Sequence, residues 1–239
     1  MSRTPGPRDA RAPTALSGVA HSGRPPREPP QRPGWEPLSE AYLAVAADYE
    51  HRAQLFPGWR ELLVARLAPR YADTVVDVSC GTGLNFDALR RRVGSGGHII
   101  GIEESPELFA VARRLVTQRR WRNVTLIHAS ARMAEVPAGA DAVLFAMAHD
   151  VLQSPGALAH LFARLRPGAR VAAGGWKSPP GRLWPLGCAV CVWCRPWVAD
   201  FTGFDQPWRL LGEHVSALEV TQLGFGTGYL AHGRTRQAS

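Results

Sequence analysis

Two glycines and two carboxylates in the first half of the chain have the types and spacing of a nucleotide site. Gly81-Thr82-Gly83 follows a short valine-rich run that contains Asp77. Because glycine has no Cβ, the backbone of such a turn can approach a ligand closely. Glu103 follows Gly81 at about the 20-residue distance at which a carboxylate accepts hydrogen bonds from ribose hydroxyls. The pattern predicts a nucleotide-type cofactor bound by Asp77, Gly81, Thr82, Gly83 and Glu103.

A second pair of chemically useful side chains, His149-Asp150, follows the apolar run 141–146. In an open α/β sheet, ligands lie outside the carboxyl ends of the strands, so His149 is expected to face the reacting group. An imidazole accepts a proton near neutral pH, which makes His149 the first candidate for a general base and Tyr49 the second. The alternative is that His149 only caps a loop or is satisfied by Asp150.

Alternating strands and helices must position these residues. Apolar runs and turn signals predict strands at 75–79, 98–102, 123–128, 141–146 and 169–175, and helices at 58–67, 85–92, 106–118 and 155–165. Ser105 and Pro106 mark a helix start, and Arg166-Pro167-Gly168 indicates a stop before the fifth strand. Two further strands are expected at 218–222 and 228–233. The alternation predicts an α/β fold with a parallel sheet and right-handed crossovers.

The stretch D-V-S-C-G-T-G-L-N-F at 77–86, followed by G-I-E-E-S-P at 101–106, resembles motif I and its successor in class I S-adenosylmethionine-dependent methyltransferases. Phe86 stands where a dinucleotide fingerprint has its third glycine, which argues against NAD or FAD. The resemblance covers about residues 40–239. It implies a Rossmann-like doubly wound sheet, mostly parallel with an antiparallel C-terminal edge strand, and S-adenosylmethionine as the cofactor.

The same resemblance assigns further residues. Ser130 stands where the family usually has an Asp that holds the adenine amino group; its hydroxyl can still accept a hydrogen bond, and the Ala131 N–H can donate to the ring. In the family, a Tyr-Asp pair folds over the methionine end of the cofactor, and here the pair is Tyr49-Glu50. The alternative for Tyr49 is a core position on an amphipathic helix.

Composition separates a tail from a domain. Residues 1–34 contain eight of the 20 prolines, and their six arginines against two acids supply half of the +8 net charge. This segment is predicted to be a disordered tail, because it cannot bury enough apolar surface to offset its ordering entropy. Residues 35–239 are predicted to form a single methyltransferase domain with a tryptophan-rich cap at 176–208. No basic stripe with interleaved aromatic residues is present, so nucleic acid is not an expected partner.

The first residues lack an apolar signal-peptide core, and no apolar run approaches 18 residues, so a reducing, cytoplasmic location is expected. Cys188, Cys191 and Cys194 lack a fourth ligand for zinc or an iron–sulfur cluster, which predicts no metal and an apolar lining. Trp184, Trp193 and Trp197 in the cap have three interpretations. They cover a lipophilic substrate pocket, they anchor the protein at a membrane interface, or they fill an ordinary core.

These features together predict methyl transfer from S-adenosylmethionine to a small lipophilic acceptor. The resemblance is nearest to the ubiquinone and menaquinone biosynthesis group and to bacterial phospholipid N-methyltransferases. Two alternatives stay open: an enzyme of this fold that catalyses a cyclisation or rearrangement, and a non-catalytic cofactor-binding partner subunit. The sequence leaves the acceptor atom open between nitrogen, oxygen and carbon, and it does not define the oligomeric state.

Overall fold

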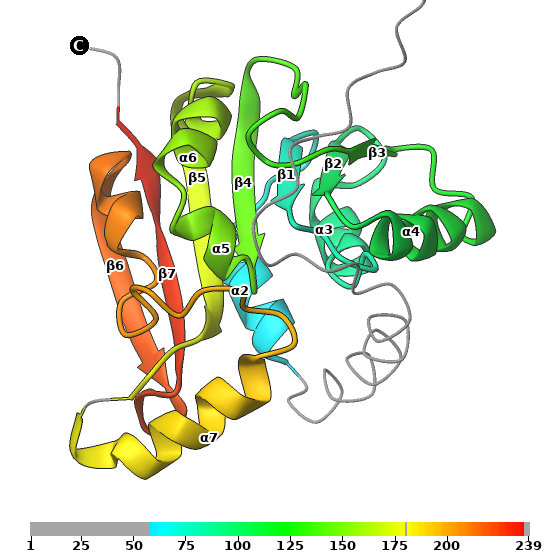
Figure 1. Cartoon of the computed structure of the whole chain (residues 1–239). Coiled ribbons are helices and arrows are strands. Elements are labelled where there is room, and N and C mark those ends of the chain that lie inside the picture. The colour runs from blue at the N-terminus through cyan, green and yellow to red at the C-terminus, as the bar shows by residue number, and fades with distance from the viewer. Residues whose placement is uncertain (1–57, 180, 237–239) are drawn as a thin grey trace, which may run out of the picture. The chain divides into compact units, whose positions relative to one another are not determined.

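A seven-stranded sheet forms the centre of the computed structural model, which describes residues 58–179 and 181–236, all within the unit Leu38–Ser239. The strand order is β3-β2-β1-β4-β5-β7-β6 (Figure 1). The strands are β1 (Thr74–Val78), β2 (His98–Glu103), β3 (Val124–His128), β4 (Ala140–Ala146), β5 (Leu165–Trp176), β6 (Val215–Leu223) and β7 (Gly228–Thr235). Strands β1 to β5 are parallel, whereas β7 runs antiparallel to both β5 and β6. The predicted α/β class, mostly parallel sheet and antiparallel C-terminal edge are confirmed.

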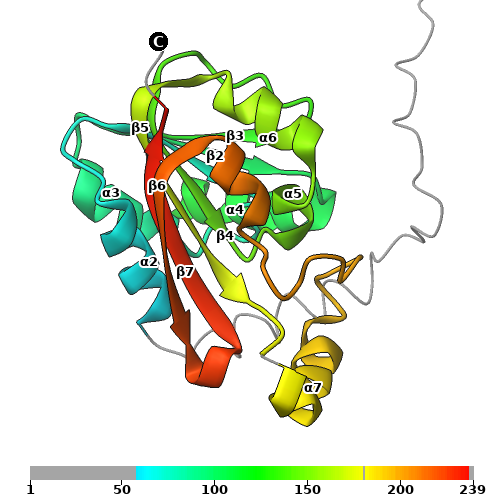
Figure 2. The same ribbon diagram turned by 90° about the vertical axis from the view of Figure 1, so that its left-hand side faces the viewer.

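Helices cover both faces of the sheet (Figure 2). They are α2 (Trp59–Leu67), α3 (Phe86–Val93), α4 (Pro106–Gln118), α5 (His149–Leu152), α6 (Pro155–Phe162) and α7 (Trp184–Cys194), with short 3-10 turns η1 (Gly181–Leu183), η2 (Arg209–Glu213) and η3 (Gly224–Gly226). Successive strand residues point to opposite faces. Val75 therefore packs with α2, α3 and α4, while Val76 packs with α5, α6 and η2. Two apolar cores result, one on each face of the sheet.

Serine caps begin two of these helices. The Ser105 hydroxyl accepts a hydrogen bond from the Leu108 N–H at 3.3 Å, with Pro106 at the first helical position. The Ser154 hydroxyl accepts from the Ala157 N–H at the same distance, before Pro155. Each cap satisfies a backbone donor that has no partner within its helix. The helix start predicted at Ser105-Pro106 is confirmed.

The sequence predicted that Arg166-Pro167-Gly168 separate a helix from the fifth strand. This prediction was wrong, because β5 already begins at Leu165. The β4–β5 ladder pairs Ala140 with Leu165 and then resumes with Ala142 opposite Arg170, so the register shifts across this stretch. Proline lacks a backbone donor and is tolerated in a sheet at such irregular positions. The three residues form an irregular first part of the strand, and α6 correspondingly ends at Phe162 instead of residue 165.

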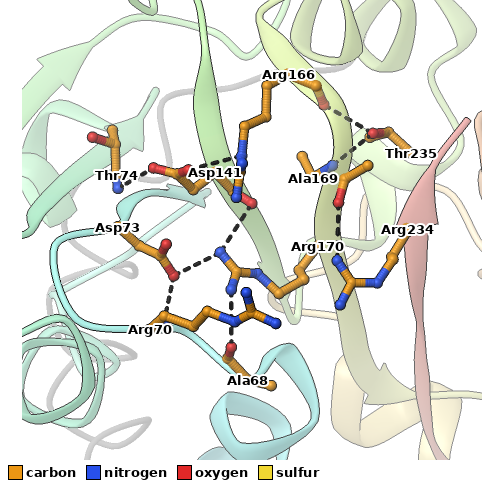
Figure 3. A network of polar contacts seen from close by, with 11 residues as sticks. Ala68, Arg70, Asp73, Thr74, Asp141, Arg166, Ala169, Arg170, Arg234 and Thr235 are labelled. Carbon is orange, nitrogen blue, oxygen red and sulfur yellow. Dashed lines mark hydrogen bonds and ion pairs between the residues drawn. The ribbon is translucent and has the colours of Figure 1, made fainter. Parts of the chain in front are cut away.

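A buried ion pair joins the segments at the amino ends of β1, β4 and β5 (Figure 3). Arg170 Nη2 lies 2.6 Å from Asp73 Oδ2, and the two side chains are only 5% and 8% exposed. The same guanidinium donates to the carbonyl oxygens of Ala68 and Asp141, each at 3.4 Å. Asp141 in turn accepts from the Thr74 N–H at 2.8 Å. This network links β5 to the chain before β1 and to the start of β4.

We expect Arg170→Ala to destabilise the protein strongly, by about 3–5 kcal/mol, because it leaves the Asp73 carboxylate buried without its partner. Arg166→Ala is the matched control. Arg166 pairs with Asp141 at 2.8 Å, but its side chain is 46% exposed, so its loss should cost at most about 1 kcal/mol. Urea unfolding of both variants measures the difference. Equal destabilisation by the two substitutions would contradict the assignment of the buried pair as the stronger interaction.

Candidate functional site

The glycine turn after β1 has one side that is open and one that is packed. Gly81 and Gly83 have φ values of 58° and 88°, in the left-handed region that favours glycine. A Cβ built at Gly81 would meet nothing within 4 Å, whereas one at Gly83 would lie 2.6 Å from the Phe86 ring. Gly83 therefore permits the close packing of α3, and Gly81 leaves room for a ligand beside the backbone.

Phe86 occupies the position of a third glycine and is fully buried. The strand opposite makes room for its ring, because a Cβ at Gly101 of β2 would lie 2.8 Å from Phe86 Cζ. Trp121 packs edge-on against the same ring, with 6.5 Å between the ring centroids. The glycine that allows close helix–strand contact thus lies on β2 in this chain, and an aromatic side chain fills the helix position.

Glu103, the last residue of β2, is buried against the glycine turn. Its Oε2 accepts a hydrogen bond from the Gly81 N–H at 2.8 Å, and its Oε1 accepts from the Ser105 N–H at 2.9 Å. Burial raises the pKa of Glu103, while these backbone donors act in the opposite direction. The Glu103 carbonyl accepts from the Ala129 N–H at 3.1 Å, which places the following residues Ser130 and Ala131 next to it.

Asp77 lies beneath the turn and is held by a residue that the sequence analysis missed. The Asn85 side-chain amide donates to both carboxylate oxygens of Asp77 at 3.1 Å. Arg60 of α2 donates to the Asn85 carbonyl oxygen at 2.9 Å. Burial raises the pKa of Asp77 to about 7, although the Asn85 hydrogen bond and the Arg60 charge lower it. The hydrogen bonds between Asp77 and Asn85 therefore connect β1 to a residue that follows the glycine turn, and they help to fix the conformation of the turn.

Thr82, between the two glycines, carries a buried hydroxyl with no hydrogen-bond partner in the described part of the chain. A buried polar group without a partner costs free energy. A hydroxyl of this kind, in a turn whose Gly81 side is open, is available to a polar ligand atom. Gly81, Thr82, Gly83, Glu103, Ser130 and Ala131 are thus gathered at the carboxyl ends of β1, β2 and β3, with Asp77 below them.

His149 begins α5 directly after β4 and is buried. Neither ring nitrogen makes a hydrogen bond of normal geometry within residues 58–179 and 181–236. The Phe204 ring packs edge-on against the imidazole, with 5.0 Å between the centroids. Burial lowers the pKa of His149, and Asp150 and the backbone of Asp200 and Thr202 partly oppose this. The lowered pKa favours the neutral ring, which can accept a proton.

An apolar cavity of about 30 Å³ lies beside His149, at the carboxyl ends of β4 and β5. The Met147 N–H donates to the Gly174 carbonyl at 2.8 Å and joins these two strand ends. The lining residues are Met147, His149, Gly175, Trp176, Cys194, Trp197, Val198, Phe204 and Tyr229. None of them carries a formal charge at neutral pH when His149 is neutral, so the walls are aromatic and apolar with a single imidazole.

The predicted cap contributes part of this wall. Trp197 and Cys194 line the cavity, while Trp193 and Cys191 pack against the cluster of Val190, Cys194, Val198 and Phe204. Cys188 is exposed. Among the described residues, no three His, Cys, Asp or Glu side chains are placed to bind a metal ion. Tyr49, the tail 1–34 and the Trp184 side chain lie outside what the structure describes. Met147, Phe204 and Tyr229 were not anticipated as cavity residues.

Comparison with known proteins agrees with this geometry. Residues 75–168 match the protein family described as "Methyltransferase domain". Demethylmenaquinone methyltransferase of Shouchella clausii is 32% identical over 78 residues, which cover 33% of either chain. Aklanonic acid methyltransferase DauC of Streptomyces sp. is 31% identical over 102 residues, 42% of this chain and 46% of that protein. The matched segment therefore spans less than half of the length of these relatives.

The fold is shared with solved structures over a longer stretch. A SAM-dependent methyltransferase from Aquifex aeolicus superposes with a TM-score of 0.55 at 17% identity, covering 78% of this chain and 97% of that one. The fold and the family match together indicate the class I S-adenosylmethionine-dependent methyltransferases. Residues 75–168 carry a methyltransferase domain of that class, as the sequence predicted.

The residues at the glycine turn fit S-adenosylmethionine. The open side of Gly81 admits a ligand against the backbone, and the buried Glu103 carboxylate beside it suits ribose hydroxyls. The unpartnered Thr82 hydroxyl offers a polar contact within the turn. We expect Ser130 and Ala131 to contact the adenine ring, as the resemblance implies.

We expect Glu103→Ala to weaken S-adenosylmethionine binding by about 1.5–3 kcal/mol, because it removes a charged hydrogen-bond acceptor at the turn. Glu104→Ala is the matched control, since Glu104 is the exposed neighbour. Isothermal titration calorimetry on the wild type and both variants measures the affinities. Equal affinities in all three proteins would mean that the ribose is held elsewhere.

Proposed function

We propose that this protein transfers a methyl group from S-adenosylmethionine to a small lipophilic acceptor. The observation that carries the proposal is the aromatic cavity beside His149. It lies at the carboxyl end of the sheet, the same edge as the glycine turn, and its lining holds no carboxylate, lysine or arginine. Ligand sites of open α/β sheets lie at this edge, and apolar aromatic walls favour an apolar ligand.

The relatives support an acceptor of this kind. Demethylmenaquinone and aklanonic acid appear in the names of the two relatives described above, and both are small organic molecules. We infer that the acceptor of this protein is likewise a small molecule with an apolar body. Its reacting atom is expected near His149, where the cavity wall carries its one titratable imidazole.

The residues of the cavity can orient the acceptor, exclude water and accept a proton. When bound, S-adenosylmethionine provides a methyl group on a positively charged sulfur. The walls formed by Trp197, Phe204 and Tyr229 keep water out and orient the acceptor, and such proximity can supply on the order of 7–11 kcal/mol. If the acceptor atom carries a proton, the neutral His149 ring accepts it as the new bond to carbon forms.

We expect His149→Gln to lower methyl transfer to a protonated acceptor by about 10²–10⁴-fold, because the proton acceptor is lost. In the wild type, kcat/KM should fall as the pH drops through the His149 pKa, which burial places below its usual 6.5. The variant should lack this acidic fall. Radiolabelled S-adenosylmethionine and a short-chain demethylmenaquinone that is chemically reduced to its hydroquinone provide the assay. His98→Gln is the control, since His98 contacts Thr125 at the opposite end of the sheet. An unchanged pH profile in His149→Gln would remove His149 from the reaction.

We expect Trp197→Ala to raise the KM for the acceptor by roughly tenfold or more, because one wall of its pocket is lost. The affinity for S-adenosylmethionine should stay unchanged, since Trp197 lines the cavity beside His149 and is not a residue of the glycine turn. Val192→Ala is the control, because Val192 lies on α7 but is exposed. Steady-state kinetics with the same acceptor and calorimetry with the cofactor separate the two effects. An unchanged KM would mean that Trp197 is an ordinary core residue, and the support for a lipophilic acceptor would be lost.

A further inference from the structure

The tip of the β6–β7 hairpin holds an aromatic side chain out in solvent. Phe225, in the middle of η3, is 88% exposed and has φ 56° and ψ 27°. Its neighbours Gly224 and Gly226 also have positive φ values, of 52° and 82°. A bulky residue in the left-handed region is strained, and an exposed Phe gains nothing from the core. Folding stability therefore does not explain why Phe stands at this position.

Three hydrogen bonds keep the turn in this conformation. The Thr227 hydroxyl and the Thr227 N–H both donate to the Gly224 carbonyl, at 2.7 and 3.1 Å. The ammonium of Lys177, the only lysine of the chain, donates to the Gly226 carbonyl at 3.1 Å. Lys177 is buried. The surrounding structure thus fixes the turn with Phe225 pointing outward.

Helix α7 lies at the same end of strands β5 and β7 as this turn (Figures 1 and 2). Lys177 also donates to the Ser178 carbonyl at 2.6 Å, and the Ser178 hydroxyl contacts Cys191 of α7 at 3.8 Å. The sequence of α7, WPLGCAVCVWC, contains no charged residue. Its outer side remains in solvent, with Val192 74% and Leu186 39% exposed. We use the name apolar edge for the exposed side chains of Phe225, Leu186 and Val192.

The sequence around α7 favours anionic lipid over other occupants. Arg182 and Arg195 flank the helix in the sequence, the first acid after it is Asp200, and residues 220–231 contain no charged residue. Lys177 is buried, and the charge of Asp205 acts on it, so it is not available to a lipid phosphate. Apolar side chains that enter the boundary of a bilayer, flanked by arginines for lipid phosphates, are typical of interfacial contacts. No helix among the described residues has the length and apolar character to cross a bilayer, so such contact would be peripheral.

We propose that the apolar edge is a membrane-contact surface, which inserts Phe225, Leu186 and Val192 into the interfacial layer of an anionic bilayer. The segment that begins at α7 also supplies Cys194, Trp197 and Val198 to the cavity wall. A bilayer bound at this edge would therefore contact the helix that covers the proposed acceptor pocket. The exposure of these side chains and the strain at Phe225 are independent of the proposed reaction.

Co-sedimentation of the full chain with vesicles tests the proposal. One set of vesicles is phosphatidylcholine, and the other contains about a third phosphatidylglycerol. We expect binding to the anionic vesicles and a roughly tenfold or greater loss of the partition coefficient in Phe225→Asn and in Val192→Asn, because each removes an inserted apolar side chain. Asn tolerates positive φ, so Phe225→Asn should melt at or above the wild-type temperature. Met133→Asn is the matched control, since Met133 is 73% exposed elsewhere on the surface, and it should bind as the wild type does.

Three outcomes would overturn the proposal. The first is that the wild type fails to bind anionic vesicles. The second is that both substitutions leave binding intact while deletion of the arginine-rich residues 1–34 abolishes it. The third is that the wild type forms a dimer which Phe225→Asn converts to a monomer without affecting vesicle binding, because a second copy would then be the occupant. Calorimetry with S-adenosylmethionine on the same variants should show unchanged affinity, so failure of membrane binding remains distinct from failure of the proposed methyl transfer.

Discussion

The hydrogen bond from the Gly81 N–H to the Glu103 carboxylate is the contact on which the candidate site depends. It joins the turn after β1 to the end of β2, and the Cys80 N–H, which donates to the Ile102 carbonyl at 2.9 Å, holds the two strand ends in register beside it. Burying a carboxylate is costly unless donors compensate, and the N–H groups of Gly81 and Ser105 do so here. The turn and its carboxylate are therefore assembled by the fold itself, before any ligand binds.

A buried ion pair fixes the amino end of the sheet. The Arg170 guanidinium bonds to Asp73 and to the Asp141 carbonyl, although Arg170 Nε has no partner among the described residues. At the carboxyl end, Ser79 and Met147 have φ values of 53° and 59° directly after β1 and β4, and Thr82 and His149 are buried without hydrogen-bond partners among the described residues. Strained and unpartnered groups persist only where the surrounding structure holds them in place. At the carboxyl end, these groups lie in and next to the candidate site.

Local patterns in the sequence predicted most of the fold, because valine-rich runs, serine caps and the glycine turn act over a few residues. The start of β5 was missed, since the tolerance of Pro167 depends on a register shift against β4 that no local pattern encodes. Asn85 was missed for a similar reason: its role requires Asp77 and Arg60 to meet from different elements. The cavity joins His149 to Phe204 and Tyr229, which lie far apart in the sequence. Burial by such distant residues lowers the pKa of His149, an effect that the His-Asp dipeptide alone does not predict.

Lys177 connects the cap to the turn that carries Phe225. An ammonium is costly to bury, and burial lowers its pKa, while the charge of Asp205 acts in the opposite direction. Its two carbonyl acceptors, on Ser178 and Gly226, lie on the segment leading to α7 and in the turn that carries Phe225. Trp176, which precedes Lys177, lines the cavity. Lys177 therefore joins the end of β5, which contributes to the cavity wall, both to the segment that leads to α7 and to the turn that carries Phe225.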